Sequence, residues 1–342
     1  MPAQVFSRLF LNFAEKECKG SSPLYEYLSV KISGDDELLS ICSRASKGQP
    51  VPNLLFGAVH YLLLKGKIHP LKEFYPSIVP IPRTYRDSYK PFRDFCLTYR
   101  NEIESILTTK LVQTNEVRRC AYLYPVFCTV YEMAKKPLAL IEIGTSAGLQ
   151  LLWDQYAYSY GRKGLFGKAD STITISSELK GELIPPLHSA PPPVSIRIGI
   201  DLHTVDVTDE EEKLWLTSLI WPEHNERRLL FEKAASFMKN VQVDLLEGDG
   251  VRLLPHYAET VPESSAICIF HTHVANQMTE ASKEQLLQTV EALGKEREVF
   301  HIYNNIQDRN LHLDCYLNGE GTRHTIAETD GHGGWFRWLM EH

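Results

Sequence analysis

The residues best placed to do chemistry form a glycine-bounded turn after a short apolar run. Residues 138–143 are apolar except for one glutamate, and the turn Gly-Thr-Ser-Ala-Gly follows at 144–148. Glycine permits backbone angles and close approaches that a Cβ atom forbids. A strand, such a turn and a helix in succession bring N–H groups and a positive helix end to a ligand. The predicted ligand-binding residues here are Glu142, Gly144, Thr145, Ser146 and Gly148.

Two known patterns overlap in this turn. The spacing Glu-x-Gly-x-x-x-Gly resembles the first motif of S-adenosylmethionine (SAM)-dependent methyltransferases with a Rossmann-like fold. The pentapeptide also matches G-x-S-x-G, the strand-to-helix turn that carries the nucleophile of α/β-hydrolases, here Ser146. A hydrolase places several strands before this turn, whereas the residues before 138 predict helices. The methyltransferase interpretation is favoured, and the serine hydrolase is kept as an alternative.

Later carboxylates extend the predicted cofactor site. A strand predicted at 194–200 leads into Asp201, whose carboxylate is expected to bind ribose hydroxyls, with Glu178 as the competing candidate. A strand predicted at 241–246 leads to Gly-Asp at 248–249. Asp249 resembles the methyltransferase residue that meets the adenine amino group.

Polar side chains that could serve an acceptor follow the next apolar run, 265–270. His271 is a candidate general base because imidazole titrates near neutral pH, and His273 and Asn276 are further catalytic candidates. His-x-His is a possible metal pair, but no other ligand motif accompanies it, so no metal is predicted. Before the first strand, Asn115 and Glu116 are candidates to face the cofactor.

Length and composition restrict the class of protein. The chain has 342 residues, of which 43% are hydrophobic, and a net charge of −7 without a basic block, which disfavours nucleic acid as a partner. No apolar run reaches membrane-spanning length. The seven cysteines contain no C-x-x-C pair, so reduced thiols in a cytoplasmic protein are expected. The partner expected from the methyltransferase interpretation is a small-molecule substrate.

Periodicity divides the chain into a helical domain at 1–135, which would cover the second, and a Rossmann-like domain at 136–342 with an insertion at about 161–193. Apolar runs that predict strands lie at 138–143, 194–200, 241–246, 265–270 and 298–303, and helical patterns lie near 149–160, 209–238 and 280–294. The alternation predicts an α/β fold with a mostly parallel sheet and helices on both faces. Residues 311–317 and 322–328 predict a C-terminal antiparallel hairpin. A seven-stranded sheet of the class I methyltransferase type is therefore expected.

Several segments together resemble a bacterial family that shares domain of unknown function 2332. They are Ser22–Tyr25, Gln113–Val117, Glu142–Leu149, Gly199–Leu202, Val205–Asp209, Trp221–Glu223 and Gly248–Asp249. The resemblance covers nearly the whole chain and implies a helical region fused to a methyltransferase-type domain, without implying a reaction.

The function expected from these patterns is SAM-dependent methyl transfer to a small polar molecule, achieved mainly by positioning the acceptor. His271 would remove a proton. The turn would hold the amino-acid end of the cofactor, Asp201 the ribose and Asp249 the adenine. A second alternative is a non-catalytic nucleotide-binding or interaction protein on the same scaffold.

Overall fold

The computed structural model describes residues 3–341, which form two compact units. The first unit holds residues 3–114 and 209–229, and the second holds 115–208 and 230–341. The last of the three boundaries, between residues 229 and 230, falls inside helix α9 (Asn225–Phe237). The helical unit is therefore built from two separate stretches of chain, whereas the sequence suggested one boundary after residue 135.

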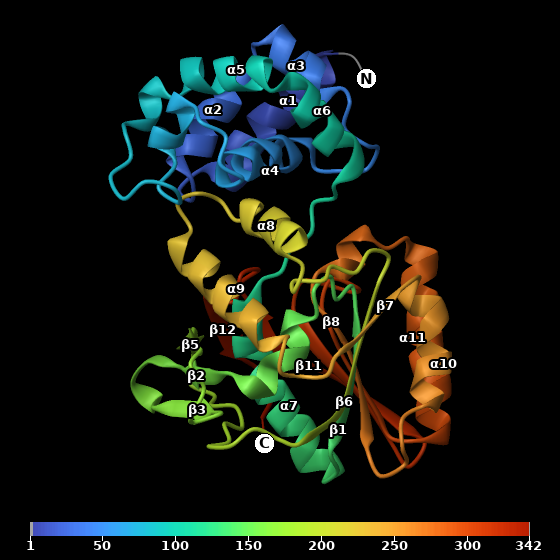
Figure 1. Ribbon diagram of the computed structural model, residues 1–342. Helices are drawn as coiled ribbons and strands as arrows, with labels where there is room; N and C mark the ends of the chain where they lie inside the picture. Colours follow the sequence, from blue (N-terminus) through green and yellow to red (C-terminus); the bar gives the residue numbers. More distant parts are fainter. Residues whose placement is uncertain (1–2, 342) are drawn as a thin grey trace. The chain divides into compact units, whose positions relative to one another are not determined.

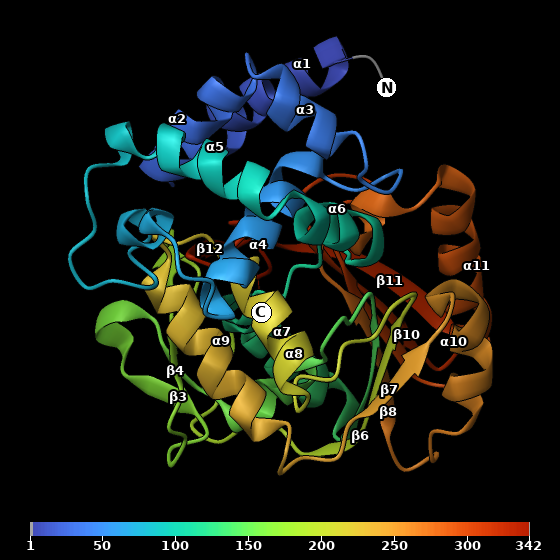
Figure 2. The same cartoon turned by 45° about the horizontal axis from the view of Figure 1, so that its top comes forward.

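The first unit is helical, with α4 (Val51–Leu64) buried along most of its length. Glu223, from the second stretch, accepts hydrogen bonds from the Ser22 hydroxyl at 2.7 Å and the Leu24 N–H at 3.0 Å. The other helices, several of which Figure 2 shows in blue and cyan with α8 in yellow, are α1 (Ala3–Phe13), α2 (Pro23–Ile32), α3 (Asp36–Cys42), α5 (Tyr89–Thr98), α6 (Arg100–Thr109) and α8 (Glu210–Ser218).

The second unit is built on a nine-stranded mixed sheet, which confirms the α/β class but not the predicted count of seven strands. The two extra strands lie together at one edge of the sheet: one comes from the insertion and the other follows the hairpin. In spatial order the strands are β5 (Glu178–Lys180), β12 (Trp335–Trp338), β11 (Glu320–Thr329), β10 (Leu311–Leu317), β9 (Val299–Tyr303), β8 (Ala266–His271), β1 (Leu138–Ile143), β6 (Val194–Asp201) and β7 (Asp244–Glu247).

Five neighbouring strands, β9, β8, β1, β6 and β7, run parallel. Numbered along the chain, their spatial order from β7 to β9 is 3-2-1-4-5, the order of a doubly wound sheet. The order reverses between β1 and β8. Ligands of such sheets bind beyond the carboxyl ends of the strands at this reversal, so we expect the functional site there.

Helices cover both faces of the parallel strands (Figure 1). On one face, α10 (Gly250–Glu259) and α11 (Glu280–Glu296) pack over an apolar core that includes Ile141 and Ile269. On the other face lies α7 (Cys120–Ala134), whose Phe127 ring is 5.4 Å from that of Phe270.

The segment expected to be a helix at 149–160 is instead a 3-10 helix, Leu149–Gln155, followed by the short strand β2, Ala157–Ser159. Two tyrosine hydroxyls hold carbonyls of the 3-10 turns: Tyr156 donates to Leu149 O at 2.9 Å and Tyr158 donates to Trp153 O. Alternating tyrosines also favour an extended chain, and β2 joins a small three-stranded sheet with β3 (Leu165–Gly167) and β4 (Thr174–Ser176) from the insertion.

The helix expected at 209–238 is broken into α8 and α9 around Trp221-Pro222, because proline cannot donate a backbone hydrogen bond inside a helix. The C-terminal hairpin is confirmed, since β10 pairs antiparallel with β11. Its turn residues Asn318 and Gly319 have φ values of 54° and 81°, typical of a tight type I′ hairpin turn.

Within residues 3–341, no helix combines the length and apolar character needed to cross a membrane. The same residues contain no group of three or more His, Cys, Asp or Glu side chains suited to hold a metal ion. All seven cysteines are buried free thiols.

Candidate functional site at the carboxyl edge of the sheet

Three residues with positive φ follow three neighbouring strands. Ser146 (φ 50°), His273 (φ 64°) and Asn305 (φ 62°) come after β1, β8 and β9. These strands are adjacent in the sheet and parallel, so the three residues lie along the same edge, at the reversal of strand order. Non-glycine residues in this conformation are strained and cluster at functional sites. The edge is therefore the candidate functional site.

The turn after β1 is held in place by the protein itself. The Asn115 side chain bridges it, since Nδ2 donates to Ser146 Oγ at 3.0 Å and Oδ1 accepts from Ala147 N at 3.1 Å. The other N–H groups of the turn also have protein acceptors: Ile200 O for Gly144 and Thr145, Asp201 Oδ2 for Ser146 and Thr145 O for Gly148. The structure thus brings together six of the predicted cofactor residues: Asn115, Gly144, Thr145, Ser146, Gly148 and Asp201.

Close packing explains the first glycine of the turn. Gly144 has φ 76°, and a Cβ atom on it would lie 2.5 Å from Cγ2 of Val274. Val274 begins the short 3-10 helix η7 (Val274–Gln277) that follows β8. The close approach expected of a ligand is made here by a side chain of the protein.

Glu142 ends up as a buried, hydrogen-bonded carboxyl group. Its exposed fraction is 3%, and Oε2 accepts from the Thr145 hydroxyl at 2.5 Å. Burial raises its pKa to about 8; the Thr145 hydrogen bond opposes the shift and the Asp201 charge adds to it. At neutral pH this carboxyl group is mainly protonated.

The two predicted nucleoside-binding carboxylates lie beside the turn. Asp201 is half-buried at the end of β6, and its Oδ1 accepts from His203 N at 3.1 Å. Asp249 is exposed and caps α10 by accepting from Val251 N at 3.0 Å, and the two segments are joined because Gly248 N donates to Asp201 O at 2.8 Å. The competing candidate, Glu178, lies on β5, which is the outermost strand on the side of the sheet away from β6 and β7.

The catalytic candidates differ in exposure. His271 is fully buried on the α10–α11 face, its ring 5.3 Å from that of His301, and burial lowers its pKa to about 3. Asn276 is exposed in η7. His273 lies at the edge, where its N–H donates to Asn304 Oδ1 at 2.7 Å and burial lowers its pKa to about 4.

Sequence reasoning missed a polar group where the 3-10 helix η4 (Val117–Arg119) leads into α7. The Arg119 side chain donates from Nε to Gly331 O at 2.9 Å and from Nη1 to the Thr272 hydroxyl at 3.3 Å. Thr272 also bonds the Gln150 side-chain amide at 3.1 Å. In the sequence Arg119 is only the second member of a basic pair, although the neighbouring Glu116, which is 2% exposed, was a candidate.

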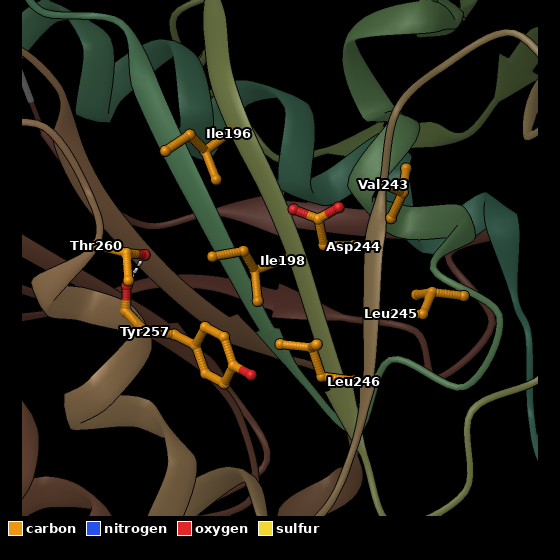
Figure 3. Close-up of a pocket in the computed structure, with 8 residues that line it drawn as sticks. All are labelled: Ile196, Ile198, Val243, Asp244, Leu245, Leu246, Tyr257 and Thr260. Carbon is orange, nitrogen blue, oxygen red and sulfur yellow. Dashed lines mark hydrogen bonds between the residues drawn. The ribbon is translucent and has the colours of Figure 1, made fainter.

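A cavity of about 480 Å³ lies elsewhere, along β6, β7 and the end of α10 (Figure 3). Its lining is mostly apolar, and the hydroxyl of Thr260 donates to the backbone oxygen of Tyr257 at 2.7 Å. None of the predicted site residues lines this cavity. The polar edge, rather than this groove, is therefore the better candidate for a functional site.

Comparison with known families matches this chain to one described as "Uncharacterized protein conserved in bacteria (DUF2332)", over residues 7–338. The chain belongs to this family. The match spans both units, which confirms the resemblance seen in the sequence. No curated protein and no solved structure matches the chain.

Proposed function

We propose that the second unit binds SAM and transfers its methyl group to a small polar acceptor. One observation carries the proposal: the glycine turn, Asp201 and Asp249 follow β1, β6 and β7, three neighbouring parallel strands. Segments expected separately to meet the amino acid, the ribose and the adenine are thus consecutive along one edge.

The donor set fits the nucleoside half of this cofactor. A carboxylate offers about four acceptor positions, of which Asp201 uses one for Ser146 N and one for His203 N. Asp201 therefore keeps acceptors for ribose hydroxyls, and exposed Asp249 keeps one for an adenine amino group. The amides of the β1 turn already donate within the protein, so the amino-acid half would depend on side chains of the edge.

When bound, the cofactor would supply an electrophilic sulfonium methyl group. The acceptor atom would form the new bond to that carbon while the C–S electron pair stays on sulfur, and the proton of the acceptor would pass to water. The protein contributes mainly position, which can lower a barrier by several kcal/mol. His271 is fully buried, so no proton removal is assigned to it here.

Calorimetric titration of the full chain with SAM and S-adenosylhomocysteine tests the proposal. Asp249→Asn keeps a capping side chain on α10 but presents an amide to the adenine, so about tenfold weaker binding is expected. Asp209→Asn is the matched control, because Asp209 caps α8 in the same way within the first unit, and it should leave binding unchanged.

Micromolar binding by wild type that Asp249→Asn weakens would support the cofactor assignment, and binding without turnover of any acceptor would favour a non-catalytic role. Absence of binding would overturn the assignment. Equal binding by both variants would contradict the adenine position.

One observation favours a serine hydrolase as a second candidate: Ser146 has φ 50°, as expected of a nucleophile on a strained turn. Two observations oppose it. The Ser146 hydroxyl bonds Asn115, and no histidine is among its partners in the described chain. The described residues before Leu138 also form no strand. Labelling of Ser146 by a fluorophosphonate probe would favour the hydrolase.

A further inference from the structure

Arg119 is a buried guanidinium at an electrostatically unfavourable position. Its residue is 7% exposed, and it stands at the N-cap of α7, a helix of 15 residues. The N-terminal end of a helix carries partial positive charge, which repels a cation and attracts an anion. Placing arginine here raises the local positive potential on the α7 side of the edge.

No carboxylate of the described chain forms a hydrogen bond or an ion pair with Arg119. Its hydrogen bonds go to two neutral acceptors, Gly331 O and the Thr272 hydroxyl, which use two of its five N–H donors. The ion pairs within residues 3–341 do not include it. Glu142 is near enough to feel its charge, but burial raises the pKa of that carboxyl to about 8. Buried charges are normally paired, so the missing partner is informative.

Two further buried polar atoms at the same edge lack protein partners. They are Nδ2 of Asn304, whose residue is fully buried, and Nε2 of His273. The Asn304 amide is oriented by its Oδ1, which accepts from His273 N, so Nδ2 is the free donor. Asn305 Nδ2 lies 3.5 Å from His273 Nδ1; if it donates there, Nε2 carries the proton.

The segments that carry Arg119, His273 and Asn304 are linked to one another by hydrogen bonds. Gly331, whose carbonyl accepts from Arg119, lies against the His273 ring, since a Cβ atom on it would be 3.7 Å from Cε1. His273 in turn is bonded to Asn304. Gly333 holds this loop close to η4, because an added Cβ would lie 2.5 Å from Arg118 O. Segments following β8, β9 and β11 thus converge on the start of α7.

We propose that Arg119, His273 and Asn304 bind a carboxylate of a small-molecule ligand, which in the proposed methyl transfer is the acceptor. A guanidinium matches a carboxylate in a bidentate pair. One fixed cation with two neutral donors balances a single negative charge, and the nearby carboxylate of Asp330 disfavours a dianion such as phosphate. The acceptor assignment rests on the proposed function, whereas the carboxylate site stands without it.

The test compares thermal unfolding of the full chain in acetate, malonate, inorganic phosphate and chloride at equal ionic strength and pH. We expect a carboxylate to raise the unfolding midpoint by about 2 °C or more above chloride. Arg119→Gln should abolish this difference, and Asn304→Ala should reduce it. Arg118→Gln, which changes the adjacent arginine, is the control and should retain it. Each variant is compared with its own midpoint in chloride, so a loss of stability alone does not count.

A wild-type midpoint that is the same in every anion would overturn the site, as would an unchanged response in Arg119→Gln. A response to phosphate alone would overturn the carboxylate assignment. Titrations with S-adenosylhomocysteine and 5′-methylthioadenosine, which lacks the amino acid, identify the source. Unchanged affinity of Arg119→Gln for both supports the acceptor, whereas weaker binding of S-adenosylhomocysteine alone transfers the carboxylate to the cofactor and overturns the acceptor assignment. If neither compound binds wild type but the anion response persists, the proposed function fails and the carboxylate site stands.

Discussion

Glu142 couples the stability of the second unit to pH through one buried carboxyl group. Burial raises its pKa from 4.5 to about 8, so the folded protein keeps a proton that the unfolded chain loses. The stability it contributes is complete below about pH 4.5 and is lost as the pH rises to about 8. Glu142→Gln removes this loss. Relative to wild type, the free energy of unfolding of the variant should increase by about 2–4 kcal/mol between pH 5 and pH 8.

Urea unfolding at several pH values in this range measures the effect. Glu296→Gln, at an exposed position of α11, is the control and should run parallel to wild type. A Glu142→Gln curve that also runs parallel would show that Glu142 ionises normally in the folded protein.

At the scale of residues, the sequence allowed a prediction where the pattern is local. Glu142, Ser146 and Asp201 were assigned to one site because a glycine turn and a strand end are readable over a few positions, and the structure places all three around the same turn. Arg119 could not be found in this way. Its burial depends on Gly331, 212 residues away, and the loop around Gly331 reads as an ordinary turn.

The contact between α11 and β10 is so close that it leaves no room for one additional carbon atom. Gly294 lies within α11, where glycine normally costs about 1 kcal/mol relative to alanine. A Cβ atom on it would lie 2.3 Å from Cγ of Tyr316 on β10. Gly294→Ala should therefore destabilise the protein by about 1–3 kcal/mol despite the better helix propensity.

Chemical denaturation of Gly294→Ala, Tyr316→Ala and the double variant tests this contact. The two substitutions should be strongly non-additive, because removing the ring makes room for the new methyl group. Gly34→Ala, where the nearest atom would be 4.0 Å away, should have little effect. Additive losses would mean that the helix and the strand do not pack in this way.

The sequence predicted helices and strands well where periodicity and burial agree. It predicted them less well where side-chain hydrogen bonds and contacts with distant parts of the chain override the local pattern. β1 spans the predicted residues 138–143 because its apolar run is buried on both faces. Residues 149–155 have helical periodicity, but they form a 3-10 helix, and two tyrosine hydroxyls donate to its backbone carbonyls. The predicted helix then ends before residue 157, because the N–H of Ala157 donates to Ile173 O in the insertion. Such long-range partners are absent from a local pattern.

At the scale of the whole molecule, the alternation of strands and helices predicted the parallel strands. It did not predict the extra strands β5 and β12 or the discontinuous first unit, because these arise from contacts between residues distant in sequence. Residues 209–229 belong to the helical unit because they bond to residues of its first stretch, as Glu223 does to Ser22 and Leu24. The sequence pattern assigned residues 209–238 to one continuous helix. No composition change marks these junctions.

The helical unit should therefore not fold from residues 1–114 alone. Within that unit the Trp215 indole donates to Leu111 O at 2.9 Å, the Trp221 ring lies 5.9 Å from that of Tyr25, and a Cβ on Gly57 would lie 2.8 Å from Leu219. Without residues 209–229 the apolar faces against which these side chains pack would be exposed to water. This exposure would cost about 25 cal/mol of folding free energy for each Å² of apolar surface. A fragment of residues 1–114 should show no cooperative thermal transition by circular dichroism, and joining residues 209–229 to it through a flexible Gly/Ser linker should restore one. A cooperative transition in the shorter fragment would contradict this, since it would make residues 209–229 an appendage of the unit and not part of its core.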